Sequence, residues 1–249
     1  MNCKNCDSPL DGNFCANCGQ KSEIHRVTFG HFAHEFFHAF THTDKGILLL
    51  MKALVTRPGH VAKEYLDGKR KKFFNPLSFL VIVSSLYAYV SFKTGYFVAL
   101  SKLTRQPVNR EGREMYAEIM GVMVNNGKVI SLFLMPVLFS FFSWIFFKKS
   151  KHNLAENLVL NSFVLGEVFI FATFIFIPCF LLFPGIHVGI NNAAFHVFMI
   201  TYIVIAFRQF FKNNIFLTIL KAILINVLFI VFYWVFIAAF VMTQHLILD

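Results

Sequence analysis

The segment LVLNSFVLGEVFIFATFIFIPCFLLF, residues 158–183, indicates what kind of protein this is, because it is apolar over a greater length than a lipid bilayer requires. A membrane-spanning helix needs about 20 consecutive, mostly apolar residues. The segment exceeds that length and carries a single charged residue, Glu167. It therefore predicts a transmembrane helix.

The composition of the whole chain agrees with this prediction. Of 249 residues, 57% are hydrophobic and only 14% are charged, and 34 are phenylalanine, which packs well against lipid and neighbouring helices. No soluble domain of this length needs so much apolar surface, so the composition is typical of a multi-pass membrane protein. The formal net charge of +10 comes from basic residues clustered beside apolar segments. This placement fits lipid headgroups and topology signals, and we expect no nucleic-acid partner.

Four other apolar segments have a similar length. We expect five transmembrane helices in all, at about 74–98, 129–147, 158–183, 190–207 and 217–242. The fourth is the weakest signal, because Asn191, Asn192 and His196 dilute its beginning. Asn75 and Pro76 supply an N-cap and a first-turn proline for the first span.

The distribution of Lys and Arg predicts the orientation in the membrane. Eleven of them precede residue 73, three lie in the loop 148–157 and two in the loop 208–216. With five spans, the positive-inside rule places the N-terminus in the cytoplasm and the C-terminus outside. The loop 99–128 conflicts with this assignment, because its five basic residues would then lie outside, although three glutamates dilute them.

Two short cysteine motifs open the chain, Cys-Lys-Asn-Cys at 3–6 and Cys-Ala-Asn-Cys at 15–18. Four thiolates in this arrangement suit one closed, tetrahedral, structural Zn²⁺ site, with rubredoxin-like iron as the alternative ion. The expected ligands are Cys3, Cys6, Cys15 and Cys18. The predicted fold class is therefore an all-α integral membrane protein with about five transmembrane helices and a small N-terminal zinc-ribbon module.

The chain divides into three parts. Residues 1–24 form the zinc ribbon, which is too small to fold without metal. Residues 25–72 form juxtamembrane amphipathic helices with a basic end, and residues 73–249 form the transmembrane bundle. In the second part, phenylalanines face one side of a helix, and four histidines face the other: His31, His34, His38 and His42. These histidines either line a solvated or headgroup-facing side, or change charge together between about pH 5 and 8.

One pair of these histidines matches the H-E-x-x-H motif of zinc metalloproteases, with Glu35 between His34 and His38. In that chemistry the glutamate activates a zinc-bound water, and a third ligand is needed. Glu64 is the residue in the sequence that we would name for that role. The motif can also be two members of the longer histidine stripe, so a second metal site and a membrane metalloprotease stay open as an alternative.

Four consecutive basic residues directly precede the first span: Lys69, Arg70, Lys71 and Lys72. Near a membrane surface, each is worth roughly 1 kcal/mol of attraction to anionic lipid headgroups. We expect these residues to contact such headgroups, or to act simply as a topology signal for the helix that follows.

Glu167 is the outlier within the spans. A carboxylate near the middle of a bilayer costs roughly 2.5–3.5 kcal/mol on insertion scales, so it should face protein or a water-filled cavity and have a partner. Candidate partners are His196, Lys221 and Asn226. A small transporter that uses Glu167 is therefore a second alternative function.

Five stretches, in order along the first part of the chain, resemble the bacterial domain-of-unknown-function family 3667. They are Cys18-Gly19-Gln20, residues 36–42, Arg57-Pro58-Gly59, residues 65–70 and Asn75-Pro76. The most specific is Tyr-Leu-Asp-Gly-Lys-Arg at 65–70. The resemblance implies an architecture, a cytosolic zinc ribbon followed by several transmembrane helices, and it implies no catalytic residues.

Together these observations favour a non-enzymatic protein of the bacterial inner (cytoplasmic) membrane, with its N-terminus in the cytoplasm. We expect an adaptor or regulatory protein whose ribbon and juxtamembrane helices engage an unidentified protein partner.

Overall fold

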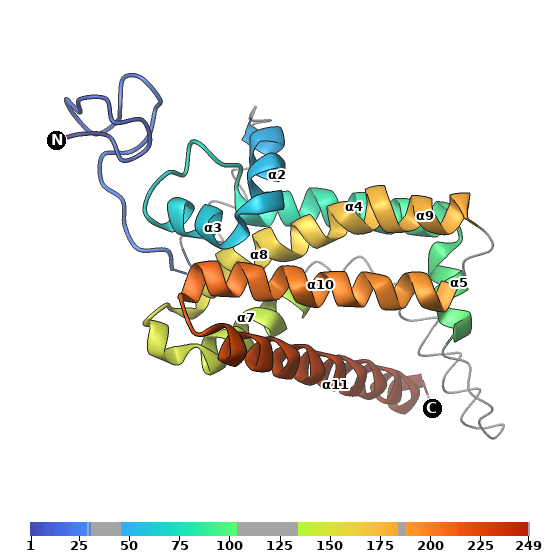
Figure 1. Cartoon of the computed structure of the whole chain (residues 1–249). Coiled ribbons are helices and arrows are strands. Elements are labelled where there is room, and N and C mark those ends of the chain that lie inside the picture. Colours follow the sequence, from blue (N-terminus) through green and yellow to red (C-terminus); the bar gives the residue numbers. More distant parts are fainter. Residues whose placement is uncertain (29, 31–45, 104–133, 184–187, 249) are drawn as a thin grey trace.

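A computed structural model describes residues 1–28, 30, 46–103, 134–183 and 188–248, and these fold mainly into helices (Figure 1). In these ranges there is no β-sheet, and strand-like pairing is confined to two isolated antiparallel bridges, Asn2 with Pro9 and Phe14 with Lys21. Both bridges lie in the N-terminal module. The predicted all-helical fold class is confirmed.

Within the described ranges, four helices are long and apolar enough to cross a membrane. They are Pro76–Lys93 (α4), Leu154–Leu182 (α8 and α9 with the π-helix that joins them), Val188–Phe211 (α10) and Ile215–Phe236, the first part of α11. Helix α11 as a whole runs from Ile215 to Leu248. The four correspond to the first, third, fourth and fifth predicted spans, so the chain is a multi-pass membrane protein.

The second predicted span, 129–147, is only partly described. Helix α7, Met135–Phe146, is apolar but has 12 residues, and residues 129–133 lie outside the described ranges. Helix α7 packs against α8 and α11. A short 3₁₀ turn, Lys148–Ser150, then leads into α8.

The first span begins as expected and ends earlier. The Asn75 side chain accepts hydrogen bonds from the backbone N–H groups of Leu77 (3.0 Å) and Ser78 (3.3 Å), and Pro76 occupies the first turn. The helix stops at Lys93 because Gly95 adopts a left-handed conformation, with φ of +68°. A separate helix, α5, follows at Tyr96–Leu103, so the predicted end at 98 was wrong.

The third span begins four residues before the predicted start at 158. Asn153 and Glu156 form a capping box, in which each side chain accepts a hydrogen bond from the backbone N–H of the other. Helix α8, Leu154–Phe171, continues through a π-helical segment, Ala172–Phe176, into α9, Ile177–Leu182. Pro178 explains that irregularity, because it has no N–H for the preceding turn.

Two short helices precede the first span, α2 at Gly46–Thr56 and α3 at Pro58–Leu66. Helix α3 lies so close to α10 that a Cβ on Gly59 would come within 2.7 Å of the Gln209 Cβ. Glycine permits this approach because it has no side chain. The Gly59 N–H donates to the Gln209 side-chain oxygen at 3.0 Å, which fixes the contact.

Aromatic rings form part of the core between α4 and α8, and Tyr65 of α3 packs with them. Phe79 is fully buried and lies against Gly166, where a Cβ would come within 2.7 Å of its ring. Phe163 contacts both Phe79 and Tyr65, with ring centroids 6.4 and 5.6 Å apart. These pairs account for part of the phenylalanine content as helix–helix packing.

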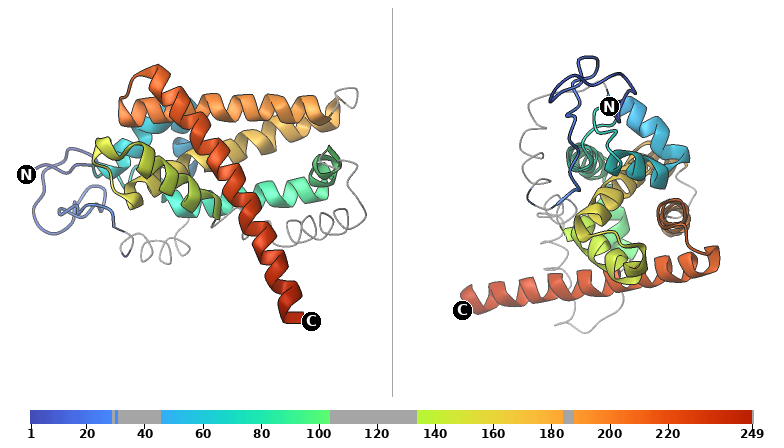
Figure 2. Two further views of the ribbon diagram at one scale, coloured as in Figure 1. Left: turned by 90° about the horizontal axis from the view of Figure 1, so that it is seen from below. Right: turned by 90° about the vertical axis from the view of Figure 1, so that its left-hand side faces the viewer.

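The N-terminal module lies at the same end of the bundle as the α7–α8 and α10–α11 turns (Figure 1). Helix α11 crosses the other helices obliquely and projects beyond them at its C-terminal part (Figure 2). The chain ends on the opposite side from its beginning.

Candidate metal centre

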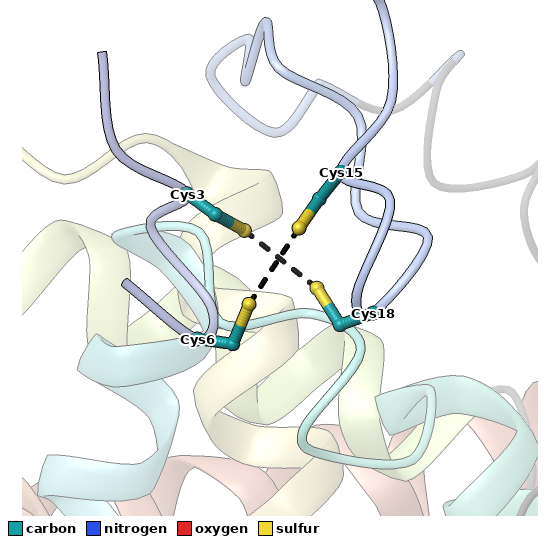
Figure 3. Close-up of side chains that lie close together, drawn as sticks. All are labelled: Cys3, Cys6, Cys15 and Cys18. Carbon is teal, nitrogen blue, oxygen red and sulfur yellow. Dashed lines mark hydrogen bonds between the residues drawn. The ribbon is translucent and has the colours of Figure 1, made fainter. Parts of the chain in front are cut away.

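Four cysteine side chains converge in the N-terminal module (Figure 3). Their sulfur atoms all lie within 4.8 Å of one another, and the Cys3–Cys18 and Cys6–Cys15 pairs are each 3.6 Å apart. A tetrahedral ion with metal–sulfur bonds of about 2.3 Å has sulfur–sulfur edges of about 3.8 Å. A disulfide would need about 2.05 Å. The cluster thus has the dimensions of a four-sulfur metal site.

The two cysteine motifs fold in the same way, twelve residues apart. In the first, the N–H of Cys3 donates to the Ser8 carbonyl (2.9 Å), and the N–H of Asp7 donates to the Cys3 carbonyl (2.8 Å). In the second, the N–H of Cys15 donates to Gln20 and the N–H of Gly19 to Cys15, each at 2.8 Å. Asp7 and Gly19 both have positive φ, +59° and +69°, and so turn the chain around the sulfurs.

The thiols differ in burial and in acidity. Cys3 and Cys15 are buried, whereas Cys6 and Cys18 are half-buried. Hydrogen bonding with Ser8 lowers the pKa of Cys6 to about 6, while desolvation raises the pKa of Cys18 to about 11. Four sulfur donors suit a soft or borderline ion such as zinc or iron, and they leave no coordination position open for a substrate.

The module sits on the loop that joins α3 to α4. The backbone N–H of Lys72 donates to the Asn5 side chain at 3.0 Å, and that of Lys71 donates to the Gln20 side chain at 3.2 Å. Gly68 has φ of +119°, and a Cβ there would collide with Ile24. Asn5 is adjacent to Cys6, and Gln20 lies two positions after Cys18. The two hydrogen bonds therefore hold the cysteine cluster against the loop.

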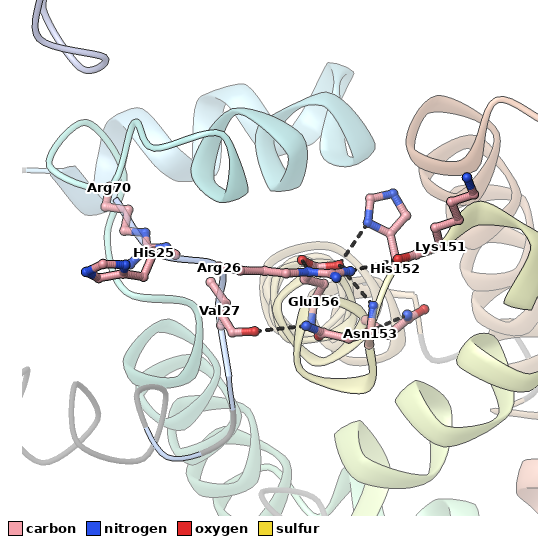
Figure 4. A network of polar contacts seen from close by, with 9 residues as sticks. His25, Arg26, Val27, Arg70, Lys151, His152, Asn153 and Glu156 are labelled. Carbon is pink, nitrogen blue, oxygen red and sulfur yellow. Dashed lines mark hydrogen bonds and ion pairs between the residues drawn. The ribbon is translucent and has the colours of Figure 1, made fainter. Parts of the chain in front are cut away.

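A second set of contacts ties the segment after the module to the start of α8 (Figure 4). The Arg26 guanidinium donates to both carboxylate oxygens of Glu156, at 2.6 and 3.0 Å, and to the Lys151 carbonyl at 2.7 Å. The Asn153 side chain donates to the Val27 carbonyl at 3.0 Å. His152 also contacts Glu156, at 3.1 Å. We call residues 25–27 the strap.

The basic run before α4 has protein partners. The Arg70 side chain donates to the His25 carbonyl at 2.7 Å, and the Lys72 ammonium lies 2.9 Å from Glu64. Arg57 approaches the same carboxylate at 2.6 Å and Lys69 at 3.8 Å. Burial alone would raise the pKa of Glu64, but these cations outweigh it and lower the pKa below its ordinary value.

The H-E-x-x-H motif and the histidine stripe lie outside the described residues, so His31, His34, Glu35, His38 and His42 are not placed. Glu64, named as a third ligand, has both carboxylate oxygens engaged by cations, Arg57 on one and Lys72 on the other.

Glu167 is buried near the C-terminal end of α8 and near the middle of the Leu154–Leu182 span, with 1% of its surface exposed. Its Oε2 atom has no hydrogen-bond partner among the described residues. Two of the expected partners are directed elsewhere, since Asn226 donates to the Ala222 carbonyl at 2.8 Å and Lys221 lies over the Phe147 ring. The hydroxyl of Tyr202, on α10, donates to the Leu54 carbonyl at 2.9 Å.

Comparison with known proteins identifies one segment. Residues 44–88 match a family described as "Protein of unknown function (DUF3667)". The matched range includes the Arg57-Pro58-Gly59 and 65–70 stretches, so the resemblance inferred from them is confirmed. The four cysteines lie outside it. No curated protein and no solved structure matches the chain.

Proposed function

We propose that this chain is a membrane-anchored regulatory or adaptor protein whose cytoplasmic N-terminal module holds one structural Zn²⁺ through Cys3, Cys6, Cys15 and Cys18. The module engages a protein partner, and its state is transmitted to the membrane bundle. In this proposal residues 1–24 form the ribbon, 25–72 the juxtamembrane connection and 73–249 the bundle.

Zinc is supported by the donor set. The sulfur–sulfur distances of 3.6 Å match a tetrahedral ion, and four thiolates fill its coordination shell. A filled shell supplies folding energy instead of Lewis-acid chemistry. The ion therefore serves to hold the shape of a small module that has little hydrophobic core.

The orientation is supported by charge. Eleven Lys and Arg precede residue 73, and five more lie at or near the α7–α8 and α10–α11 turns, at the same end of the bundle (Figure 1). They are Lys148, Lys149, Lys151, Arg208 and Lys212. Placing this end in the cytoplasm of a bacterial inner membrane satisfies the positive-inside rule.

The observation that carries the regulatory role is that the module and the strap that follows it are attached to the bundle at two separate points. A module used only as a partner-binding tag needs no fixed relation to the bundle. Here Asn5 and Gln20 bind the α3–α4 loop, and Arg26 binds the start of α8. Loss of the ion, or a partner that pulls the module away, releases both contacts together.

Hydrogen exchange on the purified full-length protein tests this coupling. Chelation of the metal, or Cys15→Ser, should speed backbone exchange both in 68–72 and in 151–157. Arg26→Gln should speed exchange in 151–157 alone, because it removes only the second attachment. Lys21→Gln is the matched control, since Lys21 is exposed and close to the cluster and should leave both regions unchanged. Unchanged exchange in 68–72 after metal loss would refute the coupling.

A transporter remains a second candidate because of Glu167. A buried carboxylate with an unpartnered oxygen is costly in a membrane, and such residues commonly mark ion or proton paths. Glu167→Gln should then abolish proton flux into proteoliposomes while helicity and zinc content stay at wild-type levels. Equal flux in both proteins would remove this candidate.

A further inference from the structure

Helix α2 lies across the bundle instead of along it. In Figure 1, α2 stands across the direction of α4 and α10, and the right-hand view of Figure 2, which looks along the bundle, shows α2 from the side. The helix has 11 residues, about half the length that a bilayer crossing requires. It is therefore not a membrane span, although it is apolar.

The first turn of α2 packs against the chain just before α4. A Cβ placed on Gly46 would lie 3.4 Å from the Lys72 carbonyl oxygen and 3.5 Å from the backbone N of Phe74. Helix α4, the first membrane-length helix, begins two residues later at Pro76. The start of α2 is therefore at the level where the chain enters the membrane.

The last turn of α2 is bound by side chains of α10. The Tyr202 hydroxyl donates to the Leu54 carbonyl at 2.9 Å, and the Gln209 side chain donates to the Thr56 carbonyl at 3.3 Å. A helix leaves its last carbonyls without intrahelical partners, and α10 supplies two of them. Tyr202 lies nine residues before α10 ends at Phe211, about 14 Å along the helix axis. The end of α2 is thus held beside the last part of this span, within its length.

The two sides of α2 are both apolar, with one lysine on the outer side. Leu50 and Leu54 are buried against the bundle. Leu48 and Val55 are 73% and 50% exposed, and Lys52 is exposed between them. These three lie on one helical face, because they are spaced by four and three residues. Such a face suits the boundary of a membrane, where the leucine and valine contact acyl chains and the lysine side chain extends to the headgroups.

Basic side chains beside α2 favour an anionic membrane surface. Arg57 follows the last residue of α2, and its guanidinium lies 2.6 Å from the Glu64 carboxylate. Lys72 and Lys69 approach the same carboxylate at 2.9 and 3.8 Å. Three cations around one carboxylate form a group with a net positive charge. Positive charge near a membrane surface attracts anionic lipid headgroups.

Lipid and a cytosolic protein partner could each cover an exposed apolar face, and the level of α2 decides between them. One end of α2 lies beside the start of α4, and the other lies beside the last part of α10. A membrane that these two helices cross surrounds the bundle at this level. A cytosolic partner would have to displace lipid to reach Leu48 and Val55.

We propose that α2 lies in the plane of the membrane, in the leaflet nearest the N-terminal module, and contacts anionic phospholipids. Leu48 and Val55 lie between the acyl chains, and Lys52 lies at the phosphate groups. This placement depends neither on the ion in the module nor on which side of the membrane is cytoplasmic. It gives the juxtamembrane connection a second hold on the membrane besides the spans.

Tryptophan fluorescence of the full-length protein in liposomes of phosphatidylglycerol and phosphatidylcholine tests the placement. The two native tryptophans, Trp144 and Trp234, are first replaced by phenylalanine, and Leu48→Trp is then introduced. Phe14→Trp in the same background is the matched control, because Phe14 is a 58% exposed apolar side chain of the N-terminal module.

The two variants should respond to opposite quenchers. Lipids with bromine near the headgroup end of the acyl chain should quench Leu48→Trp more than lipids with bromine near the chain terminus, and neither should quench Phe14→Trp. Acrylamide in the water should quench Phe14→Trp more strongly than Leu48→Trp. If Leu48→Trp loses helicity, Val55→Trp replaces it on the same face and should give the same results.

Three results would overturn the proposal. Equal quenching of Leu48→Trp and Phe14→Trp by acrylamide would place the face of α2 in water. Stronger quenching by bromine near the chain terminus would place α2 deep in the acyl region. Quenching of Leu48→Trp by neither bromine position nor acrylamide would show that protein, such as a second copy of the chain, covers the face.

Discussion

The Arg26 guanidinium donates hydrogen bonds to both carboxylate oxygens of Glu156, at 2.6 and 3.0 Å. The two residues are 130 positions apart in the sequence. Glu156 is also half of the capping box that starts α8. One carboxylate therefore closes the N-terminus of a membrane-length helix and anchors the strap that leads to the cysteine module. The strap and the start of α8 are therefore held together by the same side chain.

Breaking this pair should cost a modest amount of stability. Hydrogen bonds to charged groups are worth about 1.5–3 kcal/mol, but solvent reduces this for exposed pairs. Because the Arg26 side chain is 58% exposed, we expect Arg26→Gln to lower the free energy of unfolding by about 1 kcal/mol. Thermal unfolding of wild type and variant in detergent, monitored by circular dichroism, measures this loss of stability.

Glu156→Ala should cost more than Arg26→Gln, because it removes the cap as well. A double-mutant cycle measures the interaction free energy between Arg26 and Glu156. We expect the stability losses of the two single variants not to add up in the double variant, because both remove the same contact. Strictly additive losses would mean that the two side chains do not interact in solution.

Acid should release the α3–α4 loop through Glu64. Its pKa is lower in the folded protein than the ordinary value of 4.5, because Lys72 and Arg57 outweigh the opposing effect of burial. A carboxylate of this kind contributes its full stability above its unfolded pKa and loses it as the pH falls through the folded pKa. The loss should therefore begin near pH 4.5 and continue below it.

This prediction is tested by measuring the free energy of unfolding of wild type and Glu64→Gln as a function of pH. The variant should be less stable at pH 7 and should have a flatter profile below pH 5. Parallel profiles for the two proteins would show that Glu64 does not titrate as a member of this ion-pair network.

Features set by residues close together in the sequence, such as helix caps and the cysteine cluster, can be predicted from the sequence. Contacts between residues far apart in the sequence cannot. Asn75 and Pro76 mark the start of α4 because a cap and a first-turn proline act within one helical turn. The cysteine spacing predicts the metal cluster for a similar reason. The Asn153–Glu156 capping box has the sequence signature N-x-x-E, but hydropathy alone predicts a helix start at 158.

The long-range side-chain contacts are not marked by any pattern in the sequence around them. Nothing near Arg26 indicates a partner 130 residues away, and nothing near Lys221 indicates that it lies over the Phe147 ring. Such contacts depend on how helices pack, which hydropathy does not encode. The end of α4 at Lys93 illustrates the same limit on a smaller scale, because an apolar window continues through Gly95 although the backbone turns there.

Packing of α3 on α10 should be sensitive to a single methyl group. A Cβ at Gly59 would meet both the Gln209 side chain and the backbone N of Phe210 at 2.7 Å. Overpacking of this kind typically costs about 1–3 kcal/mol, and backbone atoms cannot move aside as a flexible side chain can. Gly59→Ala should therefore lower the thermal unfolding temperature. Gly30→Ala should not, because no atom of the described residues lies within 4 Å of a Cβ placed there. An equal effect at both positions would contradict the close packing.

Metal content distinguishes the structural site from the alternative chemistry of the H-E-x-x-H motif. Wild type should carry one zinc per chain by elemental analysis, and replacement of all four module cysteines by serine should leave none. The cluster supports this count, because its four sulfurs fill the shell of one ion. Two zinc ions in wild type, with one surviving the cysteine replacements, would instead place a second ion at His34 and His38. Glu35→Gln would then be decisive: loss of proteolytic activity with that ion retained would make the protein a metalloprotease, and no change would leave the second ion structural.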